Sequence, residues 1–101
     1  MSTMREALRE ARRRGLDENR VCLTGSINNE IQYSLAECSF EVKCVTSSVL
    51  FITVSVPGHF RQQLYSLDMG ARVRIVGELA WAKKADGRGH LLVKAASLDI
   101  L

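Results

Sequence analysis

The sequence has no apolar run long enough to cross a membrane, and its N-terminus has no leader-like segment. A transmembrane helix needs about 18 or more consecutive apolar residues, and no stretch approaches that length. The opening segment MSTMREALREARRRG lacks an apolar centre and carries Glu6 and Glu10, which argues against a secretory or mitochondrial leader. We therefore expect a cytoplasmic protein that does not contact membranes.

The few cysteines and histidines fit no metal-binding or disulfide pattern. Cys22, Cys38 and Cys44 form no CxxC pair, and an odd count leaves no closed disulfide framework. His59 and His90 stand apart from any cysteine or carboxylate pattern, so no metal site is predicted. We expect the thiols to be buried as small apolar side chains in a reducing compartment.

Signatures of catalysis are also missing. The eleven acidic residues are scattered among turns, helix caps and outward strand positions, whereas a nuclease needs carboxylates that converge on a metal. There is no glycine-rich phosphate loop, HExxH pair or nucleophile elbow. The sequence therefore predicts a protein that has no catalytic activity and no cofactor.

What the sequence does contain is enough for one small domain with an uneven charge distribution. The chain has 101 residues, 47% of them apolar, and a net charge of +3. Residues 1–20 hold six arginines against four acids, residues 21–69 hold two cations against four acids, and residues 70–101 hold six cations against three acids. Two basic ends around an acidic middle are what a polyanion-binding face produces.

Residues 3–14 are predicted to form a helix. They open on TMRE, which matches a capping box, and they are rich in alanine and arginine, which favour helix. The run from Arg12 to Arg14 is either a solvated helix face or a basic arm for a phosphate backbone. We assign residues 1–18 to this basic arm and residues 19–101 to a folded domain.

From residue 20 the apolar residues recur with a period of two, which is typical of strands. Strands are expected at residues 20–25, 39–45, 49–56, 71–79 and 90–101, with one or two helical turns at residues 59–67. Turn signals separate them, including TSS after the second strand and ADGRG before the last. The predicted fold is all-β: an OB-fold, a five-stranded Greek-key barrel with a short helix between strands 3 and 4, and an extra N-terminal helix.

The alternation also predicts which strand residues face the core. The residues expected to point inward are Phe40, Val42, Cys44, Leu50, Ile52, Val54 and Val56. Those expected to point outward include Phe51, Thr53 and Ser55. Gly25 and Gly77 fall at strand positions where a small barrel needs sharp bends.

Several segments resemble bacterial single-stranded-DNA-binding proteins and, more closely, primosomal replication protein N. NRVCLTGSI is similar to the opening strand, and MGARVRIVGELAWAKKADGRG followed by HLLVKAASLDIL is similar to the fourth strand, long hairpin and fifth strand. VPGH and a chain that stops with the strand ending LDIL resemble the primosomal type. The hairpin that is usually a longer basic finger is here shortened to TSS.

This resemblance covers about residues 19–101 and has functional implications. It implies an OB-fold accessory protein that binds single-stranded DNA in replication or replication restart. It also implies contacts with a restart helicase or loader, and assembly into a homodimer or tetramer.

Binding single strands without sequence preference requires cations for the phosphates and aromatic faces for the bases. The hairpin at residues 78–96 supplies both, and outward positions on other strands add more candidates. The predicted nucleic-acid-binding residues are Trp81, Lys83, Lys84, Arg88, Phe51, Lys43, Arg72, Arg74 and Lys94. Two alternatives stay open here, because Trp81 could equally lie in the barrel core and Phe51 could equally meet a partner subunit.

Two other functions fit the same fold. Residues 21–101 sum to a net charge of only +1, and the second hairpin is short, which favours an OB module for protein–protein contacts in a larger replication or repair assembly. Nothing in the sequence marks a reader of the 2′-hydroxyl, so single-stranded RNA is a further possible ligand.

Overall fold

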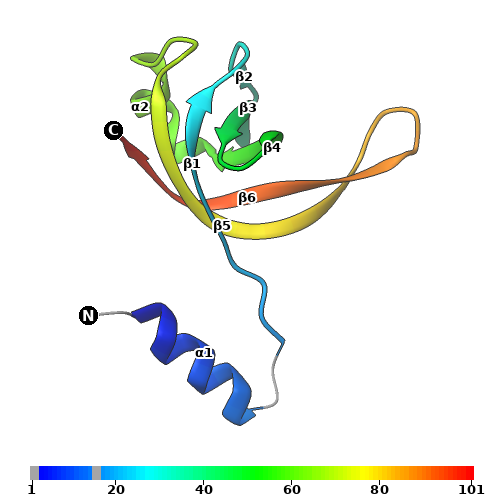
Figure 1. The fold of residues 1–101 in the computed structure, drawn as a ribbon. Helices are drawn as coiled ribbons and strands as arrows, with labels where there is room; N and C mark the ends of the chain where they lie inside the picture. The colour runs from blue at the N-terminus through cyan, green and yellow to red at the C-terminus, as the bar shows by residue number, and fades with distance from the viewer. Residues whose placement is uncertain (1–2, 15–16) are drawn as a thin grey trace.

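The computed structural model describes residues 3–14 and 17–101, which form a small barrel and an outlying helix (Figure 1). In chain order the elements are α1 (Thr3–Arg14), β1 (Val21–Ile27), β2 (Gln32–Tyr33), β3 (Glu37–Val45), β4 (Val49–Pro57), the 3-10 turn η1 (Gly58–Phe60), α2 (Arg61–Tyr65), β5 (Arg72–Lys83) and β6 (Gly89–Ile100). The predicted helices and five long strands are confirmed. The two-residue strand β2, which pairs with β3, lies in a stretch that was expected to be a connection.

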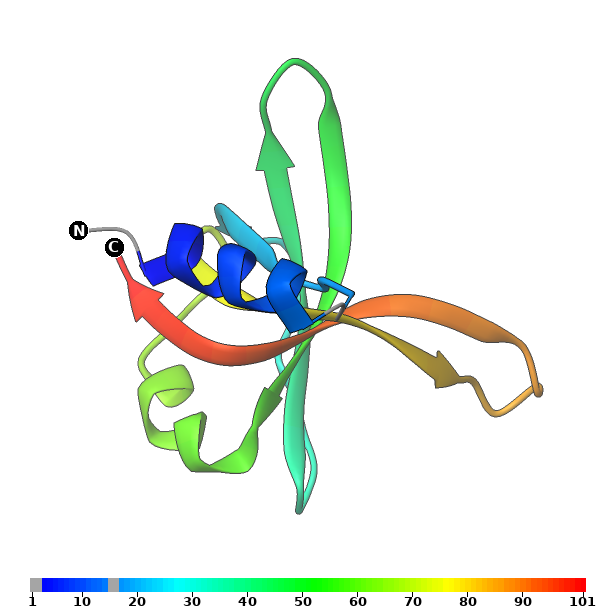
Figure 2. The same ribbon diagram turned by 90° about the horizontal axis from the view of Figure 1, so that it is seen from below.

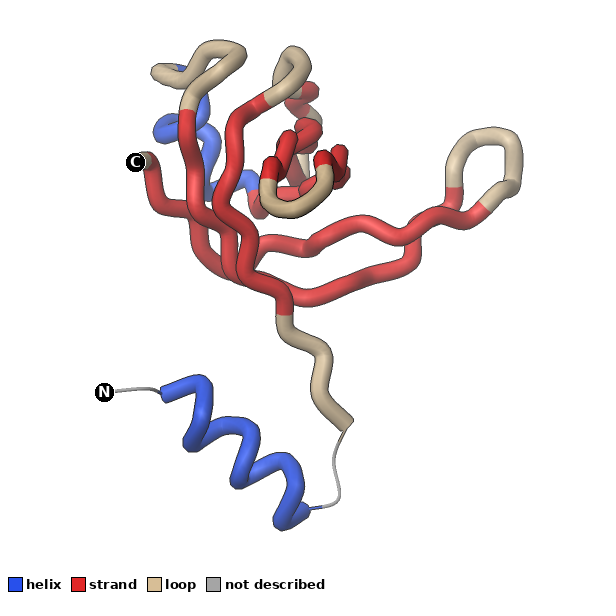
Figure 3. The backbone as a smooth tube through the Cα atoms, in the orientation of Figure 1, coloured by secondary structure: helices blue, strands red, loops and turns tan. Residues whose placement is uncertain are grey.

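The strands form one sheet in the order β1-β5-β6-β4-β3-β2, and a further pairing of β1 with β3 closes it into a barrel. Neighbouring strands are antiparallel except for β4 and β6, which run parallel where Val54 pairs with Val93 and Ser55 with Lys94. Figure 3 shows the strands curling around one another while the β5–β6 hairpin extends away from them. This closed arrangement confirms the predicted OB-fold.

Two glycines allow the long strands to bend around the barrel, as the sequence predicted. The register of β5 against β6 shifts between Val76 and Gly77, and a Cβ on Gly77 would collide with the backbone of Lys94. A Cβ on Gly25 would collide with the carbonyl oxygen of Lys43, where β1 crosses β3. Any larger side chain would force these strands apart.

The core lies inside the barrel and is made of small and medium apolar side chains. Its buried members are Ile27, Cys38, Phe40, Val42, Cys44, Val54, Val56, Leu64, Val73, Ile75, Val93, Ala95 and Leu98. Leu64 is fully buried, so helix α2 contributes to this core although it spans five residues. Phe60 packs against the cluster from the preceding turn.

Three side chains differ from the predicted pattern. Cys22 is exposed, because the residues of β1 that face the core are Gly25 and Ile27, an odd-numbered set. Leu50 is 52% exposed because it lies near the tip of the β3–β4 hairpin, beyond the barrel. Ser55 is buried, because its hydroxyl donates a hydrogen bond of 2.7 Å to Glu37 Oε2 and β4 is paired on both sides there.

The Asn19 side chain ties the segment before β1 to the barrel. Asn19 Nδ2 donates to the carbonyl oxygen of Leu79 at 2.8 Å, and the Leu79 amide donates to Asn19 Oδ1 at 2.8 Å. The Asn19 carboxamide thus pairs with the backbone of Leu79 as a neighbouring strand would, just before β1 begins. Helix α1 lies below the barrel in Figure 1 and in front of it in Figure 2. Within the described ranges, no helix is long and apolar enough to span a membrane.

Candidate nucleic-acid interface

The hairpin of β5 and β6 projects from the barrel as a finger, which we define as residues 78–94. Its strands pair from Glu78 with Lys94 to Lys83 with Gly89, and hydrogen bonds donated by backbone amides close its loop. The Lys84 amide donates to the Arg88 carbonyl at 2.7 Å, and the Arg88 amide donates to Asp86 Oδ1 at 2.9 Å. The predicted turn is therefore present, and it holds the basic tip in a defined shape.

Trp81 lies outside the core and is 65% exposed, which resolves the alternative left open by the sequence. Its indole rests against the backbone of Gly89 on the paired strand, where any Cβ would overlap the ring. Leu79 and Leu91, which are 46% and 60% exposed, belong to the same face of the finger. The result is an exposed apolar surface centred on a flat aromatic ring, as base stacking requires.

The finger also carries a cationic tip. Lys83, Lys84 and Arg88 are all exposed, and among residues 4–9 and 17–101 none of the three makes an ion pair. A free cation on a surface can approach a phosphate without first breaking an internal contact. The finger therefore combines the two kinds of group that the sequence analysis placed together.

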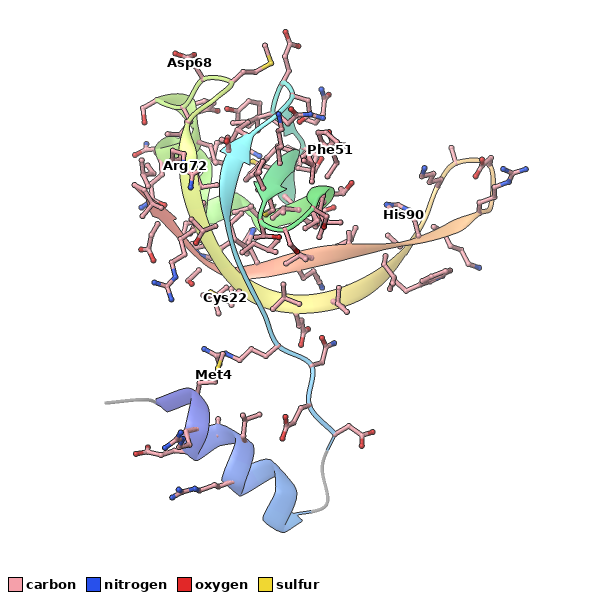
Figure 4. The ribbon with its side chains drawn as sticks, viewed as in Figure 1. Met4, Cys22, Phe51, Asp68, Arg72 and His90 are labelled. Atoms are coloured by element: carbon pink, nitrogen blue, oxygen red, sulfur yellow. The ribbon has the colours of Figure 1, made fainter. Side chains whose placement is uncertain are left out.

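A second group is assembled by strand pairing across the barrel. Phe51 on β4 lies opposite Lys43 on β3, Lys43 lies opposite Ser26 on β1, and Ser26 lies opposite Arg72 on β5. We call these four residues the barrel row. Because paired strands lie about 4.8 Å apart, the row extends roughly 14 Å over the barrel surface. Figure 4 shows its ends, Phe51 and Arg72, on different sides of the barrel.

The remaining predicted site residues are placed differently. Arg74 is exposed on the same outward face as Arg72, and its register partner on β6 is Asp99. Lys94 is exposed at the base of the finger. It lies on the face of the hairpin opposite to that of Trp81, where its register partner is Glu78. The structure thus groups Lys94 with neither the finger tip nor the barrel row.

Two groups near these surfaces have altered acidity. Burial raises the pKa of the Cys44 thiol, and the Arg72 guanidinium partly opposes that rise. Burial also raises the pKa of the Tyr33 hydroxyl, with smaller contributions from Cys38 and Tyr65 in the same direction. The rings of Tyr33 and Tyr65 lie 5.1 Å apart between centroids. Neither shift creates a nucleophile at neutral pH, since both favour the protonated form.

The sequence reasoning missed the contribution of Gly89 and Leu91. Gly89 was assigned to the turn, yet its lack of a side chain is what seats the indole. Leu91 was assigned to an apolar strand without regard to its face. The sequence did contain a signal for this pairing. If the turn is centred on Asp86 and Gly87, counting outward along both strands places Trp81 opposite Leu91.

The described residues offer no metal centre. Among them, no group of three or more His, Cys, Asp or Glu side chains is placed to hold an ion.

No protein-family model matches the sequence, and no curated protein matches it either. Several solved structures are similar to it in fold. A small single-stranded DNA-binding protein from Streptomyces coelicolor is similar with a TM-score of 0.72 at 16% identity, over 84% of this chain and 94% of that one. The N-terminal domain of PriB from Thermoanaerobacter tencongensis, described as dimeric, gives 0.68 at 18% identity, over 84% and 98%.

A mitochondrial single-stranded DNA-binding protein from S. cerevisiae is also similar, with a TM-score of 0.67 at 14% identity, over 85% of this chain and 97% of that one. These likenesses span nearly the whole of the compared chains. At such low identity they establish the fold, and the resemblance read from the sequence is confirmed at that level. The chain has the OB-fold shared by these proteins.

Proposed function

We propose that this protein binds single-stranded DNA without sequence preference and without catalysing a reaction. The observation that carries the proposal is the exposed indole of Trp81, seated on a finger whose tip bears three exposed cations. Bases would stack on Trp81 while phosphates contact Lys83, Lys84 and Arg88. The barrel row, with Phe51 beside Lys43, would continue the path. The similar folds of single-stranded DNA-binding proteins support this reading.

The test uses the intrinsic fluorescence of Trp81, because the chain has one tryptophan. Titration with oligo-dT should quench the emission to saturation. Trp81→Ala should weaken binding of a labelled oligo-dT about 5- to 150-fold, the equivalent of about 1–3 kcal/mol of stacking. Tyr65→Ala is the matched control, since Tyr65 is also exposed but lies away from the finger. Binding that leaves Trp81 emission unchanged would remove the finger from the site.

We propose further that the protein is an accessory factor of replication or replication restart, acts in the cytoplasm and self-associates as a homodimer or tetramer. A restart helicase or loader would then be its protein partner. Recovery of such a protein by cross-linking in cells, dependent on single-stranded DNA, is the result expected. Competition between oligo-dT and oligo-U of equal length separates DNA from RNA binding.

A protein–protein module is the second candidate, and one observation favours it. The tip of the β3–β4 hairpin is apolar, with Val45, Val49, Leu50 and Phe51 each at least half exposed. Its connecting residues 46–48 are uncharged. If this tip is the main interface, Phe51→Ser should abolish a protein complex while leaving the affinity for oligo-dT unchanged.

A further inference from the structure

A cleft lies at one end of the barrel, between the β1–β2 connection and the turn before β5. It has a volume of about 560 Å³ and lies between Ile31 on one wall and Leu67 and Met69 on the other. Glu30 and Asp68 line it as well, one from each wall. We call this feature the loop cleft. It is separate from the finger and from the barrel row.

Both walls of the loop cleft are held in place by hydrogen bonds. In the first wall, Asn28 Nδ2 donates to Glu41 Oε1 at 2.7 Å, and Asn29 Oδ1 accepts from the Glu41 amide at 2.7 Å. In the second wall, the Gly70 amide donates to the Ile27 carbonyl at 2.8 Å. A cleft whose walls are fixed in advance loses little conformational entropy when it is filled.

The chemistry of the loop cleft selects for arginine. Ile31, Leu67 and Met69 give it apolar surface, while neither Glu30 nor Asp68 makes an ion pair with residues 4–9 or 17–101. An arginine can lay its methylene stem along Ile31 and Leu67 and bring its guanidinium to the carboxylates. Tyr33, whose ring centroid lies 5.1 Å from that of Tyr65, also lines the cleft and is 44% exposed.

Helix α1 carries the matching groups. It holds five arginines against two glutamates, and Arg9 is exposed beside the half-buried Leu8. Leu8 lines a cleft together with Val76 and Ala95 of the chain's own barrel, so Arg9 is the side chain that α1 presents to another molecule. The helix is strongly amphipathic, yet its Met4 side chain is still 39% exposed.

The helix and the loop cleft lie at opposite ends of the molecule. Figure 4 shows Met4 below the barrel and Asp68 above it. Arg14 is five residues before Asn19, which is tied to Leu79. A fully extended connection of that length reaches at most about 18 Å. The helix therefore meets the cleft of a second copy more readily than its own.

We propose that α1 of one copy docks in the loop cleft of another, with Arg9 facing Asp68 and Glu30. Such a contact is heterologous, since it joins two different surfaces, and repetition gives a ring or a chain of copies. Copies joined in this way would occupy neighbouring positions along a single strand if the proposed function holds. The contact itself requires no nucleic acid, so the two proposals can fail independently.

A charge exchange in the full-length protein tests the contact. Sedimentation velocity over a range of concentrations, without nucleic acid, measures association at low and high salt. Arg9→Glu and Asp68→Arg should each weaken association about tenfold, because each places like charges together. The double variant should recover at least half of the loss, because its charges are again complementary. Asp99→Arg, an equal charge change on the outer face of β6, is the control and should have no effect.

The outcomes separate clearly. Recovery in the double variant supports the contact and excludes misfolding as the cause of either single loss. A wild-type protein that stays monomeric at all concentrations, or that associates equally well in both single variants, overturns the proposal. Association that Asp68→Arg abolishes but the double variant does not restore would mean that another basic surface fills the cleft, which also overturns it. Oligo-dT affinity measured in parallel reports on the proposed function alone.

Discussion

At the scale of single residues, the seat of Trp81 depends on the absence of a side chain at Gly89. A Cβ at that position would occupy the same space as the indole. Gly89→Val should therefore displace the ring, change the Trp81 emission maximum and weaken oligo-dT binding by about tenfold, within the range of one lost base stack. Ala96→Val, at an exposed position farther along β6, is the control. Unchanged emission in Gly89→Val would show that the indole does not rest there.

The thiols give a second prediction at this scale. Cys22 is exposed, whereas Cys38 and Cys44 are buried and burial raises the pKa of the Cys44 thiol. Because the thiolate is the reactive form, a raised pKa lowers the reactive fraction of Cys44 at any given pH below it. At pH 8 a maleimide should modify Cys22 in the native protein, and the other two should react only after denaturation. Mass spectrometry of the labelled peptides checks this, and rapid native labelling of Cys44 would contradict it.

At the scale of elements, the finger should account for most of the salt dependence of binding. Each phosphate neutralised on a single strand contributes about 0.7 to the slope of log K against log salt. Replacing Lys83, Lys84 and Arg88 by alanine should therefore lower that slope by about 2. Lys94→Ala should leave it unchanged, because Lys94 lies on the other face of the hairpin. Equal effects of the two changes would mean that phosphates follow a different route.

The elements themselves were largely predictable from the sequence, because alternation and turn residues are local signals. The five long strands, the helical turn before β5 and the bend at Gly77 all follow from such signals. Local signals could not predict the register in which one strand pairs with another. The barrel row exists because Ser26 lies between Lys43 and Arg72, and no pattern within one strand encodes that register.

The same limit explains the misplaced side chains. Ser55 alternates as an outward residue, but pairing of β4 on both sides and the carboxylate of Glu37 enclose it. Leu50 alternates as an inward residue, but its strand extends beyond the barrel it would fill. Lys94 belongs to the finger, but the register of β5 against β6 places it on the face opposite to that of Trp81. The position of each of these side chains depends on which residues of other strands lie beside it.

At the scale of the whole molecule, Ser55 supports closure of the barrel. It lies where β4 meets β6, and its hydroxyl donates to Glu37 at 2.7 Å. Ser55→Ala removes that hydrogen bond from a buried position and should lower the free energy of unfolding by about 1 kcal/mol. Urea denaturation measures the change, with Ser66→Ala as control because Ser66 bonds a carbonyl within one exposed turn. Equal losses in the two variants would argue against a special role for the closure.

The closure of the barrel also determines where the molecule should open transiently. Strands β4 and β6 are joined through Val54 with Val93 and Ser55 with Lys94, whereas β5 and β6 are paired along nearly their whole length. Opening costs least where the fewest hydrogen bonds must break. The β1–β3 contact, where Ser26 pairs with Lys43 and Ile27 with Val42, is equally short, so the barrel should part along these two seams into the leaves β2–β3–β4 and β1–β5–β6. Since the barrel row crosses from β3 to β1, a single strand of nucleic acid bound along the row would act as a strap that holds the β1–β3 seam shut.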